Sequence, residues 1–265
     1  MRNIFTSKRI LAAAALSSIL LIPLSATFAQ IRSSENTEQL TNLRGGRKSA
    51  PPSVNGMVTT FVLSEDLSAY TTSATFSHTV NGGKNQILVV TSGTPGGGLD
   101  TSATYGGVPM RLGRAQGSDG FVYHDYWYLV NPPTGTHDLV INFPLSGGRH
   151  YAAITISNVD TKKPFDPDAH VGSSNFGPND SQSATLSVST SVPNELVLSF
   201  IEYGGSNATY VSNDPPIFEM RTGYGNIGAT RVQYVPGTVT VGGVVSRNGG
   251  GSVWEIVAIP IRPAR

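Results

Sequence analysis

Three aspartates and a histidine share one short stretch of the sequence. The segment "NVDTKKPFDPDAH", residues 158–170, contains Asp160, Asp166, Asp168 and His170. Calcium prefers six to eight oxygen ligands from a flexible loop, and closely spaced carboxylates supply such ligands. We therefore name Asp160, Asp166 and Asp168 as candidate donors to a structural calcium ion. A series of Asx-Pro turns explains the same residues through side chain to backbone bonds, and it is the favoured alternative.

A second stretch gathers aromatic, histidine and aspartate residues. The segment "FVYHDYWYLVNPPTGTHDLVINF", residues 121–143, predicts one hairpin with a turn at "NPPTGT". Side chains alternate between the two faces of a strand. One face is expected to line a core, and its residues are Phe121, Tyr123, Asp125, Trp127 and Leu129. The other face is expected to meet solvent or a ligand, and its residues are Val122, His124, Tyr126, Tyr128 and Val130.

Exposed aromatic rings on exported β-proteins can stack on sugars while polar neighbours bond the hydroxyls. The candidate ligand-binding residues are Tyr105, Tyr123, His124, Tyr126, Tyr203 and Tyr224, on expected strands or beside glycine-rich turns. The alternative is that the tyrosines pack at sheet margins with their hydroxyls reaching water.

No residue pattern predicts a catalytic site. Glycoside hydrolysis needs two carboxylates that flank a cleft. Glu202, Glu219 and Glu255 are strand-borne candidates, with Asp125 close in pattern, but their separations cannot be read from sequence. No "GxSxG" elbow occurs, and no two histidines have the short spacing of a zinc motif. The glycines of "GYGNIG", residues 223–228, precede an expected strand, so we expect a hairpin turn there and no dinucleotide site.

The elements that must position these residues are strands. From Val54 onward, runs rich in Val, Ile, Thr and Tyr alternate with glycine, proline or asparagine breaks, as in "QILVVTS" and "ELVLSFIEY". No segment has a helical period of useful length. About twelve such runs predict an all-β domain, built as a single two-sheet β-sandwich of jelly-roll type.

The N-terminal segment predicts export. Residues 1–29 combine basic residues, an apolar run and a small-residue cleavage motif, which is typical of a signal peptide. Residues 30–53 are polar and rich in glycine and proline near their end, and predict a flexible arm before a domain at 54–265. No second apolar run reaches membrane length, so we expect no membrane span and a secreted protein, extracellular or periplasmic.

The composition limits the chemistry of the protein and the classes of partner that it can bind. The chain contains no cysteine, which excludes disulfides and thiolate chemistry, and residues 54–265 carry 11 basic and 15 acidic side chains. This acidic balance argues against nucleic-acid binding.

The runs "ATYGGVPMRLG", "YWYLVNPPTGTHDLVINF", "AAITISNVDTKKPF" and "WEIVAIPIRP" carry a resemblance. Together they resemble a group of exported bacterial β-sandwich domains in which a "TYGGV" hairpin precedes a "YLVNPPTGTH" hairpin. The resemblance runs from about Val54 to Pro263 and implies an extracellular or surface module, with no catalytic residues to carry over.

The sequence thus predicts an exported, non-enzymatic binding or adhesion module at or outside the cell surface. Its expected partner is a glycan or another cell-surface component. Two alternatives stay open. One is a lectin-like carbohydrate-binding domain or a carbohydrate-active enzyme. The other is a self-assembling matrix component that associates through exposed sheet edges.

Overall fold

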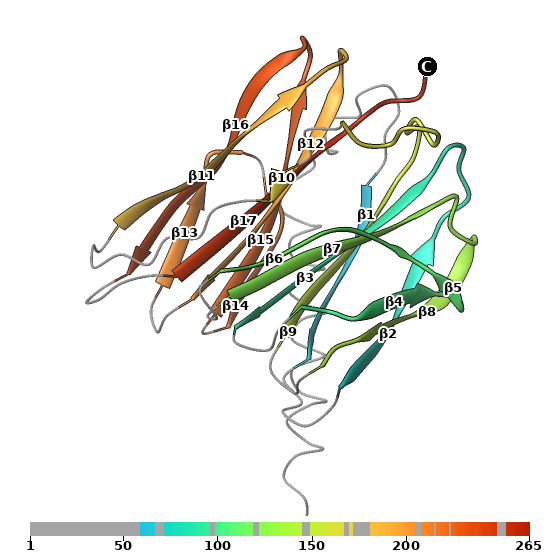
Figure 1. Ribbon diagram of the computed structural model, residues 1–265, viewed down its shortest axis with the longest axis horizontal. Helices are drawn as coiled ribbons and strands as arrows, with labels where there is room; N and C mark the ends of the chain where they lie inside the picture. The colour runs from blue at the N-terminus through green and yellow to red at the C-terminus, as the bar shows by residue number, and fades with distance from the viewer. Residues whose placement is uncertain are drawn as a thin grey trace, which may run out of the picture. The chain divides into compact units, whose positions relative to one another are not determined.

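The computed structural model describes an all-β protein (Figure 1). It describes residues 59–66, 72–95, 99–118, 122–144, 149–166, 170–171, 181–204, 208–214, 216–222, 224–247 and 253–265. These residues form strands, turns and loops and contain no helix, as the sequence predicts. All of them belong to one compact unit, Pro51–Arg265.

The first half of this unit forms two antiparallel sheets, which we call sheets I and II. Sheet I contains, in spatial order, β2 (Ser73–Val80), β8 (Gly135–Asn142), β4 (Ser102–Tyr105) and β5 (Val108–Pro109). Sheet II contains β1 (Thr59–Asp66), β9 (Arg149–Ile156), β3 (Ile87–Pro95), β7 (Val122–Val130) and β6 (Arg111–Ser118). Strands from distant parts of the sequence therefore pair within each sheet.

The second half forms two more antiparallel sheets, sheets III and IV. Sheet III contains β10 (His170–Val171), β17 (Val253–Ile261), β12 (Glu195–Gly204), β15 (Tyr224–Gln233) and β14 (Pro216–Thr222). Sheet IV contains β11 (Ser181–Thr190), β16 (Gly237–Arg247) and β13 (Ala208–Ser212). In Figure 1 these strands run from yellow to red.

Three hydrophobic clusters show how the sheets are layered. One cluster joins sheets I and II and includes Leu139, Ile141 and Leu88. A second joins sheets II and III and includes Ile154 and Leu198. The third joins sheets III and IV through residues such as Val197 and Val241. The layers therefore follow the order I, II, III, IV, and the expected single two-sheet jelly roll is not confirmed.

The two central sheets are buried on both faces, which explains their continuous apolar sequences. In β3, Ile87 and Val89 contact sheet III, whereas Leu88 and Val90 contact sheet I. The same division holds in β17, where odd-numbered Val257 and Ile259 face sheet II while Ile256 and Ala258 face sheet IV. Antiparallel sheets commonly have one solvated face. Here an outer sheet covers that face instead.

The predicted hairpin at residues 121–143 is wrong as a pairing. Strand β7 lies in sheet II between β3 and β6, whereas β8 lies in sheet I between β2 and β4. The turn after β7 begins at Asn131, which has a φ of 51° and redirects the chain to the next layer. Trp127 from β7 and Leu139 from β8 still share one cluster. The sequence pattern therefore predicts correctly that the two strands contribute to one core, but it does not predict which strands they pair with.

Candidate functional site

A pair of glutamates lies at the centre of sheet III. Strands β12 and β17 pair so that Glu202 stands directly opposite Glu255, and both side chains are fully buried. Phe200 and Val257, two residues away on each strand, belong to the cluster between sheets II and III. Because side chains two apart share a face, both glutamates point into that same interface. Directly opposed side chains in an antiparallel pair have Cβ atoms about 4.5–5.5 Å apart.

The surroundings of Glu255 favour its neutral form. Burial, followed by the negative charges of Glu202 and Asp125, raises the pKa of Glu255 to about 8. Among the described residues, neither carboxyl oxygen of Glu255 has a hydrogen-bond partner. Two carboxylates this close cannot both ionise cheaply in a buried site. Glu255 is therefore protonated at neutral pH.

Sheet II contributes a hydroxyl and an imidazole to the same interface. The Oγ1 of Thr91 lies 2.6 Å from the Nε2 of His124, and both residues are fully buried. Burial lowers the pKa of His124 to about 3, so its ring is neutral. The Nδ1 of His124 has no hydrogen-bond partner. Across the interface, the His124 ring lies 6.4 Å from the ring of Phe200, next to Glu202 along β12.

Asp125 has its own hydrogen bonds on the opposite face of β7. One carboxylate oxygen accepts the backbone N–H of Asp100 at 2.8 Å, and the other accepts the indole N–H of Trp127 at 3.2 Å. Trp127 faces sheet I. The charge of Asp125 therefore acts on Glu255 through the sheet, while its side chain anchors the loop before β4.

This buried cluster contains residue types that perform acid–base and nucleophilic chemistry. Thr91, His124, Glu202 and Glu255 are buried between sheets II and III. Asp125 is buried on the face of β7 toward sheet I. Thr91, His124, Glu202 and Glu255 are therefore closed to solvent in the described structure. In the closed fold, Glu255 keeps its proton and the imidazole of His124 is neutral. The sequence named the glutamates as carboxylate candidates, but only the strand register brings them together.

Most of the predicted ligand-binding rings lie inside the protein. His124 and Tyr126 occupy the face of β7 that we expected to be open, and sheet III covers it. Tyr105 is fully buried, and its hydroxyl donates to the backbone oxygens of His78 and Gly135 at 3.1 and 2.9 Å. These contacts leave the rings no free face on which a sugar could stack.

Three further predicted ligand-binding tyrosines lie in different places. Tyr203 is buried, and its ring stacks on that of Tyr210 at 5.8 Å. Tyr123 is half-buried in β7. Tyr224 begins β15 opposite Gly204, and its side chain lies outside the described residues. Strands β14 and β15 pair antiparallel with Thr222 opposite Tyr224, so the "GYGNIG" motif begins at the reversal of a hairpin and continues into β15.

The predicted calcium loop has local partners. The carboxylate of Asp160 accepts the backbone N–H groups of Lys162 and Lys163 at 3.0 and 3.2 Å, which is the geometry of an Asx turn. Asp166 is buried and forms an ion pair with Arg262 at 3.4 Å. Asp168 lies outside the described residues. Within the described part of the chain, no three His, Asp or Glu side chains form a group that could hold a metal ion. Calcium binding stays a prediction.

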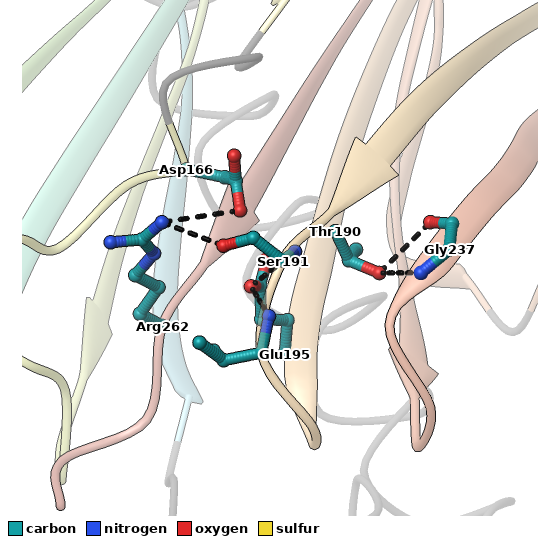
Figure 2. A network of polar contacts seen from close by, with 7 residues as sticks. Asp166, Thr190, Ser191, Glu195, Gly237 and Arg262 are labelled. Atoms are coloured by element: carbon teal, nitrogen blue, oxygen red, sulfur yellow. Dashed lines mark hydrogen bonds and ion pairs between the residues drawn. The ribbon is translucent and has the colours of Figure 1, made fainter.

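Arg262 joins segments that are far apart in the sequence (Figure 2). Its guanidinium donates to the Ser191 hydroxyl at 2.7 Å and to Asp166 at 3.4 Å. In the adjoining turn, one oxygen of Glu195 accepts the N–H groups of Ser191 and Val192 at 3.0 and 2.8 Å. Burial raises the pKa of Glu195, opposed by these two hydrogen bonds. No sequence pattern predicts this network, because its members are distant along the chain.

Comparison with known proteins adds no family to this description. No protein-family model matches the chain, and no match is found among curated proteins or solved structures. Within the described ranges, no helix has the length and apolar character needed to cross a bilayer.

Proposed function

We propose that the chain is an exported, non-enzymatic binding module that acts at or outside the cell surface through its outer sheet faces. The observation that supports the proposal is that buried and exposed faces carry different kinds of polar group. The described carboxyl and imidazole groups of sheets II and III are buried, whereas the outer faces of sheets I and IV carry rows of hydroxyl groups. The apolar run and cleavage motif of residues 1–29 support export.

The outer face of sheet IV is uncharged among the described side chains. Alternate residues of β11 and β16, such as Ala184 and Val241, point into the cluster with sheet III. The remaining positions face outward, and they are Ser183, Thr185, Ser187, Ser189, Thr209, Val211, Thr238, Thr240, Val244 and Ser246. Neighbouring rows are linked by hydroxyl contacts, as between Ser187 and Thr240 at 2.7 Å. The face therefore presents repeated hydrogen-bonding groups with no net charge.

The outer face of sheet I has a similar character. Its outward residues are Ser73, Thr75, Ser77, Thr79, Ser102, Thr104, Thr136, Asp138, Val140 and Asn142. The hydroxyls of Thr79 and Thr136 lie 2.8 Å apart, and the amide of Asn142 donates to Ser102 at 2.9 Å. A hydroxyl both donates and accepts hydrogen bonds, so such rows complement a polyhydroxylated polymer. This favours the carbohydrate-binding alternative as the more specific form of the proposal.

Two matched double variants test the proposal. Ser187→Lys with Thr240→Lys alters sheet IV, and Thr79→Lys with Thr136→Lys alters sheet I, in each case at a directly opposed hydroxyl pair. Binding to insoluble polysaccharides and to a glycan array is measured for both and for the unmodified chain. We expect the unmodified chain to bind and one double variant to lose at least about tenfold in affinity, because lysine blocks close approach.

Three outcomes would count against this function. The first is that the unmodified chain binds nothing, and the second is that both variants bind unchanged. The third is release of reducing ends from a polysaccharide, which would support the carbohydrate-active enzyme instead. Light scattering over a concentration series separates the matrix alternative, which requires concentration-dependent growth of particles. Circular dichroism of each variant controls for loss of the fold.

A further inference from the structure

One end of the described unit is made of turns that hydrogen bonds tie together. The backbone N–H of Asn158 donates to the carbonyl of Lys84 at 3.0 Å, and that of Ala264 donates to Asn158 at 2.7 Å. The N–H of Asp160 donates to the carbonyl of Arg262 at 2.9 Å. These bonds place the turn before β3, the loop after β9 and the segment after β17 beside one another.

The same end continues into sheets III and IV. The guanidinium of Arg262 donates to the Ser191 hydroxyl at 2.7 Å, which reaches the turn between β11 and β12. The adjacent Thr190 hydroxyl donates to the carbonyl of Gly237 at 3.0 Å and accepts its N–H at 3.1 Å. Gly237 closes the turn between β15 and β16 (Figure 2). A continuous set of contacts therefore links Lys84 to this turn.

Two large apolar side chains project from that turn. Tyr234 is 65% exposed and Val235 is 68% exposed. The side-chain amide of Gln233 donates to the carbonyl of Val235 at 2.8 Å, and the Thr190–Gly237 bonds hold the other side of the turn. The two residues are thus presented to solvent by a bonded turn. Tyrosine at such a tip has an apolar ring and a polar hydroxyl, a combination enriched at membrane–water interfaces.

Exposed positive side chains outnumber exposed carboxylates among the described residues at this end. Lys84, Lys162 and Lys163 are all exposed at this end. The described carboxylates of these turns are hydrogen-bonded, ion-paired or buried. Asp160 accepts backbone N–H groups, Asp166 is paired with Arg262, and Glu195 is buried. Residues 54–265 as a whole are acidic, with 11 basic and 15 acidic side chains, so the lysines are concentrated against the overall balance.

We propose that this end docks peripherally on an anionic membrane surface. Tyr234 and Val235 would enter the headgroup region, while the three lysines would contact anionic headgroups. Membrane association of this kind combines a modest apolar contribution with electrostatic attraction, and neither alone holds a protein firmly. The proposal involves the turns at one end and not the outer sheet faces. It therefore stands or fails separately from the polysaccharide-binding function.

The absence of cysteine allows a direct test with the full chain. Val235→Cys and Val211→Cys each introduce one thiol, at two positions that are both 68% exposed. Val211 lies on β13 in sheet IV, on the outer face and away from the proposed docking end. Each thiol carries a polarity-sensitive fluorophore. Emission is recorded with phosphatidylcholine vesicles, with and without phosphatidylglycerol, and with dextran sulfate in place of vesicles.

We expect the probe at residue 235 to shift to the blue only with phosphatidylglycerol, while the probe at residue 211 does not respond. Replacing all three lysines, as Lys84→Gln, Lys162→Gln and Lys163→Gln, should weaken this response by roughly tenfold or more, since each lysine near an anionic surface adds to the attraction. Three results would overturn the proposal. The first is unchanged emission from the probe at residue 235, and the second is an equal emission shift at residues 235 and 211. The third is the same emission shift with dextran sulfate, which would identify a soluble polyanion as the partner. Attachment through the apolar run of residues 10–24 would leave both probes unchanged.

Discussion

At the scale of single residues, the most unusual feature is a buried acid whose oxygens have no partner. Glu255 is fully buried opposite Glu202, and neither of its carboxyl oxygens is hydrogen-bonded within the part of the chain that the structure describes. A buried carboxyl without a partner is costly in its ionised form and less so when protonated. The folded protein therefore binds a proton at Glu255 under conditions in which the unfolded chain releases it.

This proton makes stability depend on pH in a defined direction. The pKa of Glu255 is about 8 in the fold, against an ordinary value of 4.5. Between these two values the folded state holds more protons than the unfolded state, so the free energy of unfolding falls as pH rises. The expected slope is about 1.4 kcal/mol for each pH unit, and it ends near the folded pKa.

Glu255→Gln removes the ionisation but keeps a side chain of similar shape. We expect the variant to be more stable than the unmodified chain at pH 8 and to gain little below pH 4.5. Urea denaturation at a series of pH values measures the difference. Asp138→Asn, which alters an exposed carboxylate on β8, is the matched control and should keep the original slope. Parallel pH profiles for Glu255→Gln and the unmodified chain would contradict a neutral Glu255.

At the scale of elements, alternation and turn residues predicted the strands but not their partners. The run "SATFSHTV" predicts a strand at 73–80, and β2 has the same bounds. The strands β3, β12 and β17 were also expected where they occur. Their unbroken apolar runs are typical of strands buried on both faces. That signal for covered central sheets was present in the sequence, although we had expected one two-sheet body.

The register between paired strands could not be predicted from the sequence. Glu202 and Glu255 are separated by many residues, and only the pairing of β12 with β17 makes them neighbours. Likewise, the alternation within β7 was predicted correctly, but not the sheet that covers the face bearing His124. A single strand reveals which side chains share a face. What lies against that face depends on the whole chain.

Close approach of strands in sheet IV gives a prediction at the same scale. Gly243 lies in the central strand β16, and an added Cβ would collide with the carbonyl oxygen of Val211 and lie 2.9 Å from the Cα of Ser212. These are backbone atoms of the edge strand β13, which cannot rotate away. We expect Gly243→Ala to cost about 1–3 kcal/mol of stability by displacing β13.

Thermal unfolding of Gly243→Ala measures this cost. Gly82→Ala is the control, since an added Cβ there meets nothing within 4 Å. The control should change the melting temperature little, because it creates no collision. Equal melting temperatures for Gly243→Ala and the unmodified chain would show that β13 does not lie against β16 as described.

At the scale of the whole molecule, buried titratable groups in different layers set the pH of greatest stability. Burial lowers the pKa of His78 to about 4 and that of His124 to about 3, against an ordinary value of 6.5. His78 donates to or accepts from the Thr155 hydroxyl at 2.8 Å, between sheets I and II, and His124 lies between sheets II and III. Both must remain neutral for these layers to stay closed.

The histidines and the glutamates act in opposite directions. Below pH 6.5 the unfolded chain protonates both histidines before the fold does, so stability falls as pH falls. Above pH 4.5, ionisation of Glu255 in the unfolded chain lowers stability as pH rises, and the raised pKa of Glu195 acts in the same direction. Below pH 6.5 the two histidines outweigh Glu255, and Glu195 moves the balance point to a lower pH. Above pH 6.5 the histidines no longer contribute a slope, and only the glutamate effect remains.

We therefore expect the free energy of unfolding to reach its maximum at or slightly below pH 6.5, with a decline on both sides. Urea denaturation from pH 4 to pH 9 measures the profile, and each arm has its own diagnostic. If stability rose continuously to pH 9, Glu255 would not be a neutral acid in the fold. If stability did not decline from pH 6.5 to pH 4.5, the two histidines would already be charged there, and sheets I, II and III could not pack around them as dry layers. The position of the maximum thus reports whether the titratable groups between sheets I, II and III are closed to water.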